Sequence, residues 1–412
     1  MRAGTSINRM GGTPTRERAP DLLVAGAGAI GLAVAWRAAQ RGMDVVVVER
    51  DGAGEATSRV AAGMLAPVAE VEFGGAGRRL LELAMRSARL WPSFAEQLAN
   101  ASGIEILMRP TGTLLLARDS DEEAELERQL EFRRSLGLDV RRLRPSAARE
   151  LEPALAPTLR AALEAPGDHS VDPRPVLAAL RAACFAAGVR IREHTSFEGV
   201  EHDGRAVQSA VLAGGERIAA GAVVLATGPW SGVLAGLPEG ATLPVRPVKG
   251  QILRLRDPAG PGLLERVIRY QGGYVVPRGD GRYVLGGTVE ERGFDVSPTA
   301  GAMNELLREA RELLPGVTEL EIEELSVGMR PGTPDNLPAI GRAAVEGLWW
   351  ASGHYRNGIL LTPLTAELVA GALCGEDGGE AMEWCDPARF AVAARARPTS
   401  RTERAGRAEA LR

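Results

Sequence analysis

A glycine-rich turn between a short apolar strand and an alanine-rich helix is the feature that most constrains how this chain can fold. Residues 22–25 predict a buried strand, residues 29–41 a helix that ends before Gly42, and the four valines of residues 45–48 a second buried strand. The turn before the helix reads Gly26-Ala27-Gly28-Ala29-Ile30-Gly31. A strand, a GxGxxG turn and a helix in this order predict a βαβ unit that binds a dinucleotide.

Each glycine of this turn has a physical role. Gly26 permits the tight turn, Gly28 lets the backbone approach a pyrophosphate, and Gly31 allows the helix to pack closely on the strand. The helix N-terminus attracts the phosphate charge. Glu49 ends the second strand and would accept hydrogen bonds from the ribose hydroxyls, which disfavours NADP with its 2′-phosphate. The cofactor contacts predicted in this unit are Gly26, Gly28, Ala29, Ile30, Gly31, Glu49 and Arg50.

NAD and FAD both fit this unit, and a remote strand separates them. Residues 222–226 predict a buried strand that ends in Thr227-Gly228. In flavoproteins of the glutathione-reductase type, a late strand with such a small-Thr-Gly end passes beside FAD. We therefore expect FAD, with Gly228 as a further contact.

The length of the chain and the order of its elements predict two domains. At 412 residues the chain exceeds what one compact core usually holds. Parallel-sheet elements occur at the beginning, middle and end, whereas residues 243–288 have the short alternating strands of an antiparallel sheet. The predicted fold class is α/β, with a Rossmann-type, glutathione-reductase-like FAD-binding domain and an inserted substrate domain of mixed or antiparallel β-sheet. We assign residues 21–85, 150–240 and 325–390 to the FAD-binding domain, 86–149 and 241–324 to the substrate domain, and 1–20 and 391–412 to disordered tails.

Charge and composition argue against several classes of partner. The net charge is −4, and because the two tails together carry +7, the body between them carries −11, which argues against nucleic acid. No apolar run has the length of a membrane span, and the N-terminus lacks the apolar stretch of a signal peptide. Cys184, Cys374, Cys385 and the four histidines show no metal-ligand spacing. We expect a cytoplasmic protein with no metal and no membrane partner; its oligomeric state stays open, a homo-oligomer included.

Four further motifs follow the fingerprint along the chain. They are Ala61-Ala62-Gly63-Met64-Leu65-Ala66-Pro67, Pro247-Val248-Lys249-Gly250-Gln251, Gly328-Met329-Arg330-Pro331-Gly332-Thr333 and Gly353-His354-Tyr355-Arg356-Asn357-Gly358-Ile359. With these motifs the chain resembles the FAD-dependent D-amino-acid oxidase superfamily, and within it the glycine oxidases of the thiamin thiazole pathway. The resemblance spans nearly all of residues 21–375.

The resemblance implies further contacts with FAD. It places residues 354–360 around the pyrimidine edge of the flavin, where the N–H groups of this loop and of a helix over residues 363–374 would meet negative charge. We expect Thr362 to be the N-cap and Pro363 the first residue of that helix. The contacts implied by the resemblance are Thr57, Ser58, Ala62, Gly63, Met64, Phe197, His354, Tyr355, Arg356, Asn357, Gly358, Ile359 and Leu360.

The resemblance also implies a carboxylate site. Arg330 would pair with the substrate carboxylate, Tyr274 would donate its hydroxyl to the same group, and Arg356 would border the pocket. The alternative is that Tyr274 packs in a sheet and that both arginines lie in surface turns. The implied reaction is oxidative deamination of glycine, sarcosine, D-alanine or D-proline to the imine and 2-oxo acid, with dioxygen reduced to hydrogen peroxide.

The sequence departs from sarcosine oxidases, which bind FAD through a cysteine and place a lysine over the ring. The matching stretches, near Ser326-Val327 and Val284-Leu285, contain neither residue, so we expect noncovalent FAD. Two other functions stay open: a D-amino-acid or D-proline dehydrogenase that passes electrons to a quinone, and a non-catalytic FAD-binding or RNA-modifying flavoprotein. Pocket volume decides among the small amino acids, and the sequence does not determine it.

Overall fold

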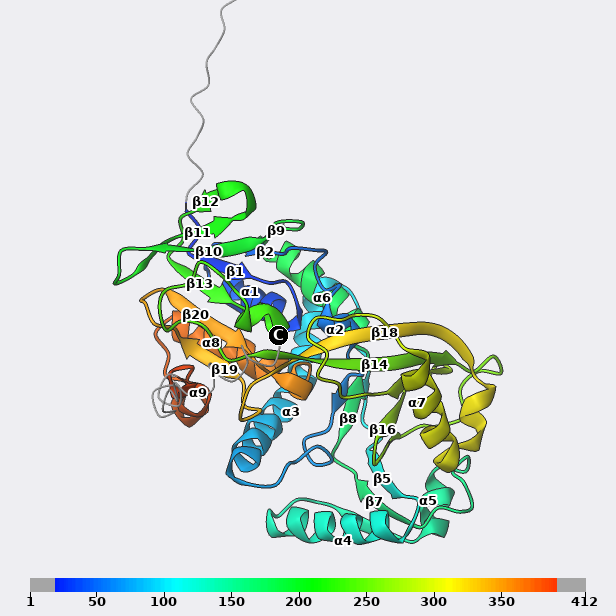
Figure 1. The fold of residues 1–412 in the computed structure, drawn as a ribbon. Coiled ribbons are helices and arrows are strands. Elements are labelled where there is room, and N and C mark those ends of the chain that lie inside the picture. Colours follow the sequence, from blue (N-terminus) through cyan, green and yellow to red (C-terminus); the bar gives the residue numbers. More distant parts are fainter. Residues whose placement is uncertain (1–18, 391–412) are drawn as a thin grey trace, which may run out of the picture.

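The structure, a computed structural model, describes residues 19–390, which form two large β-sheets with helices packed on them (Figure 1). The predicted disordered tails, apart from Ala19 and Pro20, lie outside the described residues. Within residues 19–390, no helix has both the length and the apolar character that crossing a bilayer requires.

The first sheet has six strands in the order β19-β20-β13-β1-β2-β9. All neighbours are parallel except β19, which runs antiparallel to β20. The chain continues from β1 to β2 on one side, while β13 pairs with β1 on the other, so the carboxyl end of β1 lies where α/β sheets bind their ligands. The strands are β1 (Leu22–Ala25), β2 (Val45–Val48), β9 (Arg190–Arg192), β13 (Ala222–Leu225), β19 (Ala339–Arg342) and β20 (Leu348–Ser352).

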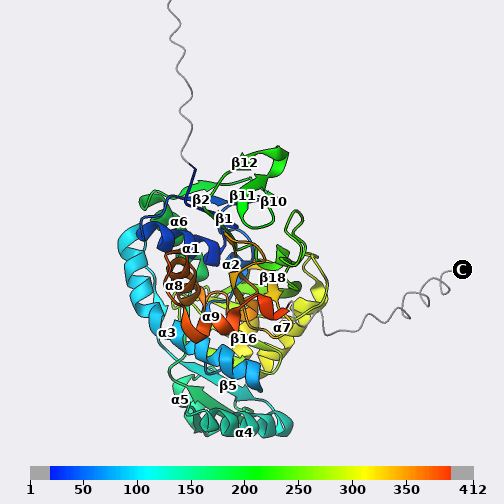
Figure 2. The same ribbon diagram turned by 90° about the vertical axis from the view of Figure 1, so that its left-hand side faces the viewer.

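Both faces of this sheet are covered, which explains why its strands are continuously apolar. Leu22 and Val24 of β1 belong to the core formed with the helices, whereas Leu23 and Ala25 belong to the core formed with a three-stranded sheet, β10-β11-β12. In Figure 2 the helices α1, α3, α6 and α8, which cover one face, lie together beside the sheet. The covering elements are α1 (Ala29–Gln40), α3 (Gly75–Ser102), α6 (Pro173–Ala186), α8 (Thr362–Leu373), β10 (Phe197–His202), β11 (Val207–Leu212) and β12 (Arg217–Ile218).

The second sheet has eight strands in the order β18-β14-β17-β16-β15-β5-β7-β6. It is mixed, because β15 runs parallel to β5 while the other neighbours are antiparallel. Helix α7 (Ala300–Leu313) packs on one face, and α4 (Ser120–Ser135) packs on β5 and β7. The strands are β5 (Thr113–Ala117), β6 (Arg141–Leu143), β7 (Ala161–Ala165), β14 (Arg246–Arg256), β15 (Val267–Tyr270), β16 (Gly273–Pro277), β17 (Arg282–Gly286) and β18 (Glu321–Gly332).

The long strands β14 and β18 pair along their whole length and connect the two halves of the molecule (Figure 1). A small third sheet has the order β3-β8-β4, and its strands belong to segments of the chain that connect the two large sheets. The remaining α-helices and strands are α2 (Thr57–Val60), β3 (Met64–Leu65), β4 (Met108–Arg109), α5 (Pro145–Leu151), β8 (His169–Val171) and α9 (Gly379–Cys385).

Three predicted domain boundaries fall differently from the strands and helices. The boundary at residue 150 assigns β7 to the FAD-binding domain, but β7 pairs with β5 and β6 in the eight-stranded sheet. The boundary at residue 325 falls inside β18, and the boundary at residue 86 falls inside α3, which packs on α6 and α8 along its length. The boundaries were predicted from changes in the local sequence pattern. Strand pairing and helix packing are contacts between distant segments, and such changes do not reveal them.

Candidate functional site

A cavity with a volume of about 530 Å³ is lined by residues from both large sheets. At one end it reaches the glycine turn of residues 26–30 and the end of β2, and at the other it reaches β14, β16 and β18. Residues 56–64 form one wall between these ends, with all but Arg59 lining the cavity. The cavity therefore joins a nucleotide-type turn to the middle of the eight-stranded sheet.

The glycine turn has the close contacts that its sequence predicts. Gly26 has φ of +104°, and a Cβ atom there would lie 2.6 Å from the Ala226 carbonyl oxygen. A Cβ atom on Gly31 would overlap the Gly26 carbonyl, so Gly31 packs α1 on the turn and does not line the cavity. Among the described residues, the N–H groups of Ile30 and Gly31 have no protein acceptor, which leaves this helix N-terminus open to an anion.

The nucleotide end of the cavity contains an aromatic residue that sequence reasoning missed. The Arg50 guanidinium lies 4.4 Å from the centre of the Trp230 ring, and both residues line the cavity together with Phe197. Glu49 also lines it, and its Oε2 accepts a hydrogen bond from the Ala27 N–H at 2.7 Å. Trp230 follows the small-Thr-Gly strand end by two residues, so its nearness to that motif was the available signal.

Some of the FAD contacts predicted in the loop before α8, residues 354–360, line the cavity. His354, Tyr355, Arg356, Gly358 and Ile359 line it, whereas Asn357 and Leu360 do not. Asn357 is buried and its backbone carbonyl accepts from the Leu361 N–H, and the Leu360 carbonyl accepts from the Ser87 hydroxyl and the Trp91 indole N–H of α3. The N–H groups of Gly358, Ile359 and Leu360 have no acceptor within residues 19–390, which favours negative charge beside them.

The predicted N-cap at Thr362 is wrong. Thr362 lies inside α8, and its hydroxyl donates to the Gly358 carbonyl at 2.8 Å instead of accepting from the helix. The chain is already helical before this residue, because the Leu361 N–H donates to the Asn357 carbonyl. A short helical turn therefore runs into α8 without a side-chain cap.

His354 is the buried histidine of the cavity. Its ring is held by Thr365 of α8, with 3.0 Å between Nε2 and Oγ1. Burial lowers the pKa of His354 to about 3, so the ring is neutral at physiological pH. It contributes a fixed polar contact and no charge.

At the other end of the cavity the structure brings Arg330 and Tyr274 together. Arg330 extends from β18, and its Nη1 donates to the Thr288 carbonyl at 2.9 Å. Tyr274 extends from β16, and Gly287 lies beside both the Tyr274 hydroxyl and the Arg330 guanidinium. Arg356 also lines the cavity, with its guanidinium 5.1 Å from the Tyr355 ring centre. An arginine and a tyrosine hydroxyl in one half-buried gap can bind a carboxylate.

An ion pair between Glu70 and Arg269 lines the same region and was not predicted. Arg269 of β15 is the cross-strand partner of Tyr274, so both side chains lie on the cavity face of the sheet. Arg269 lies beside Tyr274 because of the register of β15 and β16, and the sequence motifs do not indicate this register. Among the described residues, no group of three or more His, Cys, Asp or Glu side chains could hold a metal ion.

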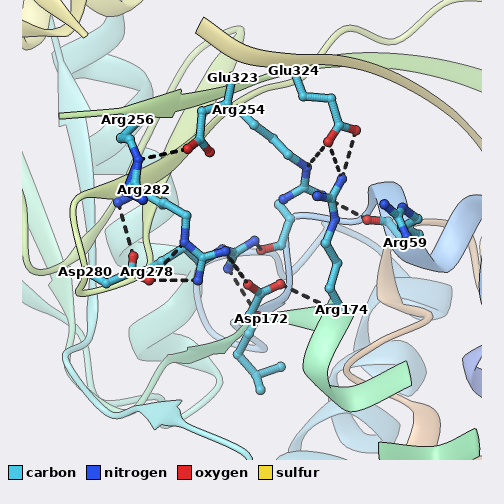
Figure 3. A network of polar contacts seen from close by, with 12 residues as sticks. Arg59, Asp172, Arg174, Arg254, Arg256, Arg278, Asp280, Arg282, Glu323 and Glu324 are labelled. Carbon is cyan, nitrogen blue, oxygen red and sulfur yellow. Dashed lines mark hydrogen bonds and ion pairs between the residues drawn. The ribbon is translucent and has the colours of Figure 1, made fainter. Parts of the chain in front are cut away.

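Two buried arginines of the eight-stranded sheet hold the wall of residues 56–64 from behind (Figure 3). Arg254 of β14 donates from Nη2 to the Arg59 carbonyl at 2.8 Å. Arg278, which follows β16, donates from Nη2 to the Ala62 carbonyl at 2.8 Å. The wall is thus fixed relative to the strands that carry Tyr274.

Two acidic residues balance the charge of these arginines (Figure 3). Asp172 lies 3.9 Å from Arg278 Nε, and Glu324 lies 3.9 Å from Arg254 Nε. Asp172 is the N-cap of α6, so the network also joins α6 to the eight-stranded sheet. Burial lowers the pKa of Arg278 to about 10, which leaves it charged at neutral pH.

Comparison with known proteins gives a consistent set of matches. The sequence pattern of the family described as FAD dependent oxidoreductase matches residues 21–372. The chain is similar to a glycine oxidase of Geobacillus kaustophilus (strain HTA426), with 37% identity over 354 residues, which cover 85% of this chain and 92% of that protein. It is also similar to a bifunctional protein ThiO/ThiG of Synechocystis sp. (strain ATCC 27184 / PCC 6803 / Kazusa), with 35% identity over 90% of this chain and 54% of that protein.

A solved structure agrees with these matches. The crystal structure of glycine oxidase from Geobacillus kaustophilus superposes with a TM-score of 0.81 at 35% identity, over 87% of this chain and 96% of that one. The resemblance and the α/β fold class predicted from the sequence are thereby confirmed.

We expect Arg278→Met to destabilise the protein by about 3–5 kcal/mol, the usual cost of breaking a buried charged pair. The variant leaves Asp172 and the Ala62 carbonyl without this partner, and we expect FAD to bind more weakly because the wall loses a support. Chemical unfolding and a fluorescence titration with FAD measure the two effects. Arg256→Met is the matched control, since its ion pair with Glu323 is 45% exposed on the arginine side and should contribute only about 0–1 kcal/mol. Equal effects of both substitutions on stability and FAD binding would contradict the role of Arg278 in supporting the wall.

We expect the difference in unfolding free energy between the wild type and His354→Gln to fall as the pH is lowered from 6.5 toward 3. In this window the folded ring stays neutral, because its pKa is about 3, while the unfolded chain takes up a proton at an ordinary pKa of 6.5. Protonation of the unfolded state therefore costs the wild type about 1.4 kcal/mol per pH unit. Urea unfolding of both proteins across this range measures it, and a constant difference would argue against a buried neutral ring.

Proposed function

The chain belongs to the FAD dependent oxidoreductase family, and we propose that it oxidises the amine of glycine and similarly small amino acids. The products are the imine and then the 2-oxo acid, with dioxygen reduced to hydrogen peroxide. Sarcosine, D-alanine and D-proline share the carboxylate and amine of glycine and belong to the same substrate class. We place the reaction in thiamin thiazole biosynthesis, in line with the names of the ThiO/ThiG relatives.

The single observation that carries this proposal is the convergence of Arg330 and Tyr274 in the cavity that also reaches the glycine turn. A guanidinium and a phenol hydroxyl can hold one carboxylate through charge-assisted hydrogen bonds. The pair and the fingerprint line the same cavity. A carboxylate-bearing substrate and a dinucleotide cofactor thus meet in one space.

The residues of the chain act by binding and positioning. Arg330 would bind the carboxylate, Tyr274 would donate its hydroxyl to it, and the substrate Cα–H would then point into the cavity, so that orientation supplies much of the rate. FAD, when bound, supplies the hydride acceptor. The amine enters neutral, and its electron pair forms the C=N bond as hydride leaves Cα. The imine then hydrolyses to glyoxylate and ammonia when the substrate is glycine.

The lining residues fit a reaction without a protein base. His354 is neutral, with its pKa lowered by burial, and is bonded to Thr365. Glu70 is paired with Arg269. A hydride transfer from a substrate with a neutral amine requires no proton abstraction at carbon.

We propose that FAD is held noncovalently and that the protein is cytoplasmic. Of the three cysteines, Cys184 and Cys385 are buried in the helix layer, Cys374 is exposed, and none of them lines the cavity. All three are free thiols, which suits a reducing compartment. Lys249, the single lysine of the chain, is paired through Nζ with Asp295 at 2.7 Å and does not line the cavity.

Two assays test the function. Glycine added without oxygen should bleach the flavin absorbance. If none of glycine, sarcosine, D-alanine and D-proline bleaches it, the protein is not an oxidoreductase of these amines. Hydrogen peroxide formed in air separates an oxidase from a dehydrogenase that passes electrons to a quinone. The ranking of the four amines by rate identifies the preferred substrate.

We expect Arg330→Ala to raise the KM for glycine by about 30-fold to more than 1,000-fold, the factor that corresponds to losing one partner of a buried charged pair. The flavin spectrum should stay intact, because Arg330 contributes to the substrate end of the cavity. Steady-state peroxide formation measures the KM. Arg342→Ala is the control, since Arg342 is exposed on β19 and does not line the cavity. Unchanged kinetics in Arg330→Ala would refute the carboxylate assignment.

A further inference from the structure

Glycines occupy the positions on the cavity face of the eight-stranded sheet over which the side chains of Arg330 and Tyr274 lie. Directly opposed residues of antiparallel strands share a face. Gly286 is opposed to Tyr274 on one side and to Ile252 on the other, and Gly250 is opposed to Gly328. These positions are therefore on the same face as the candidate carboxylate site, and the glycines were not among the predicted site residues.

Gly250 makes room for the guanidinium of Arg330. A Cβ atom built on Gly250 would lie 2.6 Å from Cζ and 2.6 Å from Nη2 of Arg330, closer than side-chain carbons approach such atoms. Arg330 therefore lies back over the bare backbone of β14. The overlap involves the far end of a flexible side chain, so an added methyl group would move the guanidinium and spare the strand.

Gly286 makes room for Tyr274 in the same way. A Cβ atom there would lie 2.6 Å from the Tyr274 hydroxyl oxygen and 2.7 Å from Cζ. Because Tyr274 and Gly286 are cross-strand partners, the phenol ring lies over the glycine. Any side chain on β17 at this point would push the hydroxyl away from Arg330.

Gly287 leaves the gap between the two groups open. A Cβ atom on Gly287 would lie 3.0 Å from the Tyr274 hydroxyl oxygen and 3.2 Å from Arg330 Nη2. A methyl group there would therefore fill the space next to the hydroxyl and the guanidinium, which the glycine leaves open to a ligand.

We infer that Gly250, Gly286 and Gly287 determine the specificity of the carboxylate site, Gly250 and Gly286 by positioning Arg330 and Tyr274 and Gly287 by leaving space for the carboxylate. This inference rests on the proposed function in one respect only, the identity of the bound group as a carboxylate. It explains why an arginine and a tyrosine from separate strands keep one fixed spacing.

Gly250→Ala and Gly287→Ala test the inference, since both overlaps can be relieved without moving backbone. The probe is acetate, a carboxylate without an amine. Its binding is measured by the change that it causes in the flavin absorbance. We expect the Kd for acetate and the KM for glycine to rise at least about tenfold in each variant, the factor for one lost charged hydrogen bond. FAD affinity and melting temperature should stay at the wild-type values in both variants. The control Gly301→Ala, a helix position with nothing within 4 Å of an added Cβ atom, should leave the Kd for acetate and the KM for glycine unchanged.

A double substitution separates a direct contact from a general disturbance. If Gly250 acts by positioning Arg330, then Gly250→Ala should add no further effect on acetate binding in the Arg330→Ala background. An additive effect, an unchanged Kd for acetate in both single variants, or loss of FAD from them would each overturn the inference. A wild-type protein that binds acetate but does not oxidise glycine refutes the proposed function alone, and the acetate measurements still decide the role of the glycines.

Discussion

The segment of residues 56–64 is the constraint on which the cavity depends, because it is held from both halves of the molecule. On one side the Ala29 N–H at the start of α1 donates to the Ser58 hydroxyl. On the other side Arg254 and Arg278 donate to the Arg59 and Ala62 carbonyls from the eight-stranded sheet. Buried carbonyls need such partners, and charged donors are the strongest available. These contacts tie the glycine turn to the strands of the eight-stranded sheet through one segment.

Arginine supplies nearly all the positive charge in this protein, and its geometry suits the two tasks it has here. A planar guanidinium can donate to a carbonyl with one nitrogen while facing a carboxylate with another, as Arg278 does with Ala62 and Asp172. It can also lie flat on a bare strand, as Arg330 does on Gly250. The same side chain thus fixes the cavity wall in one place and is available to a ligand in the other.

Much of the nucleotide half could be predicted because its signals are local. The strand, turn and helix of residues 22–40 are contiguous, and the contact of Gly31 with the Gly26 carbonyl is a property of that turn. The substrate half was harder. Arg269 reaches the cavity only because β15 pairs with β16. Leu360 does not line the cavity, and its carbonyl is held by Ser87 and Trp91 of α3.

The sequence by itself determined the dinucleotide turn, the βαβ unit, the family and the residue types that could bind a carboxylate, because each is written in a short motif with a fixed spacing. The tertiary structure alone decided which strands share a sheet, that β7 belongs with β5, and that three glycines lie next to Arg330 and Tyr274. Strand register sets which side chains meet across a sheet, and it is fixed by contacts between segments far apart in the chain. The carboxylate site is made of such contacts.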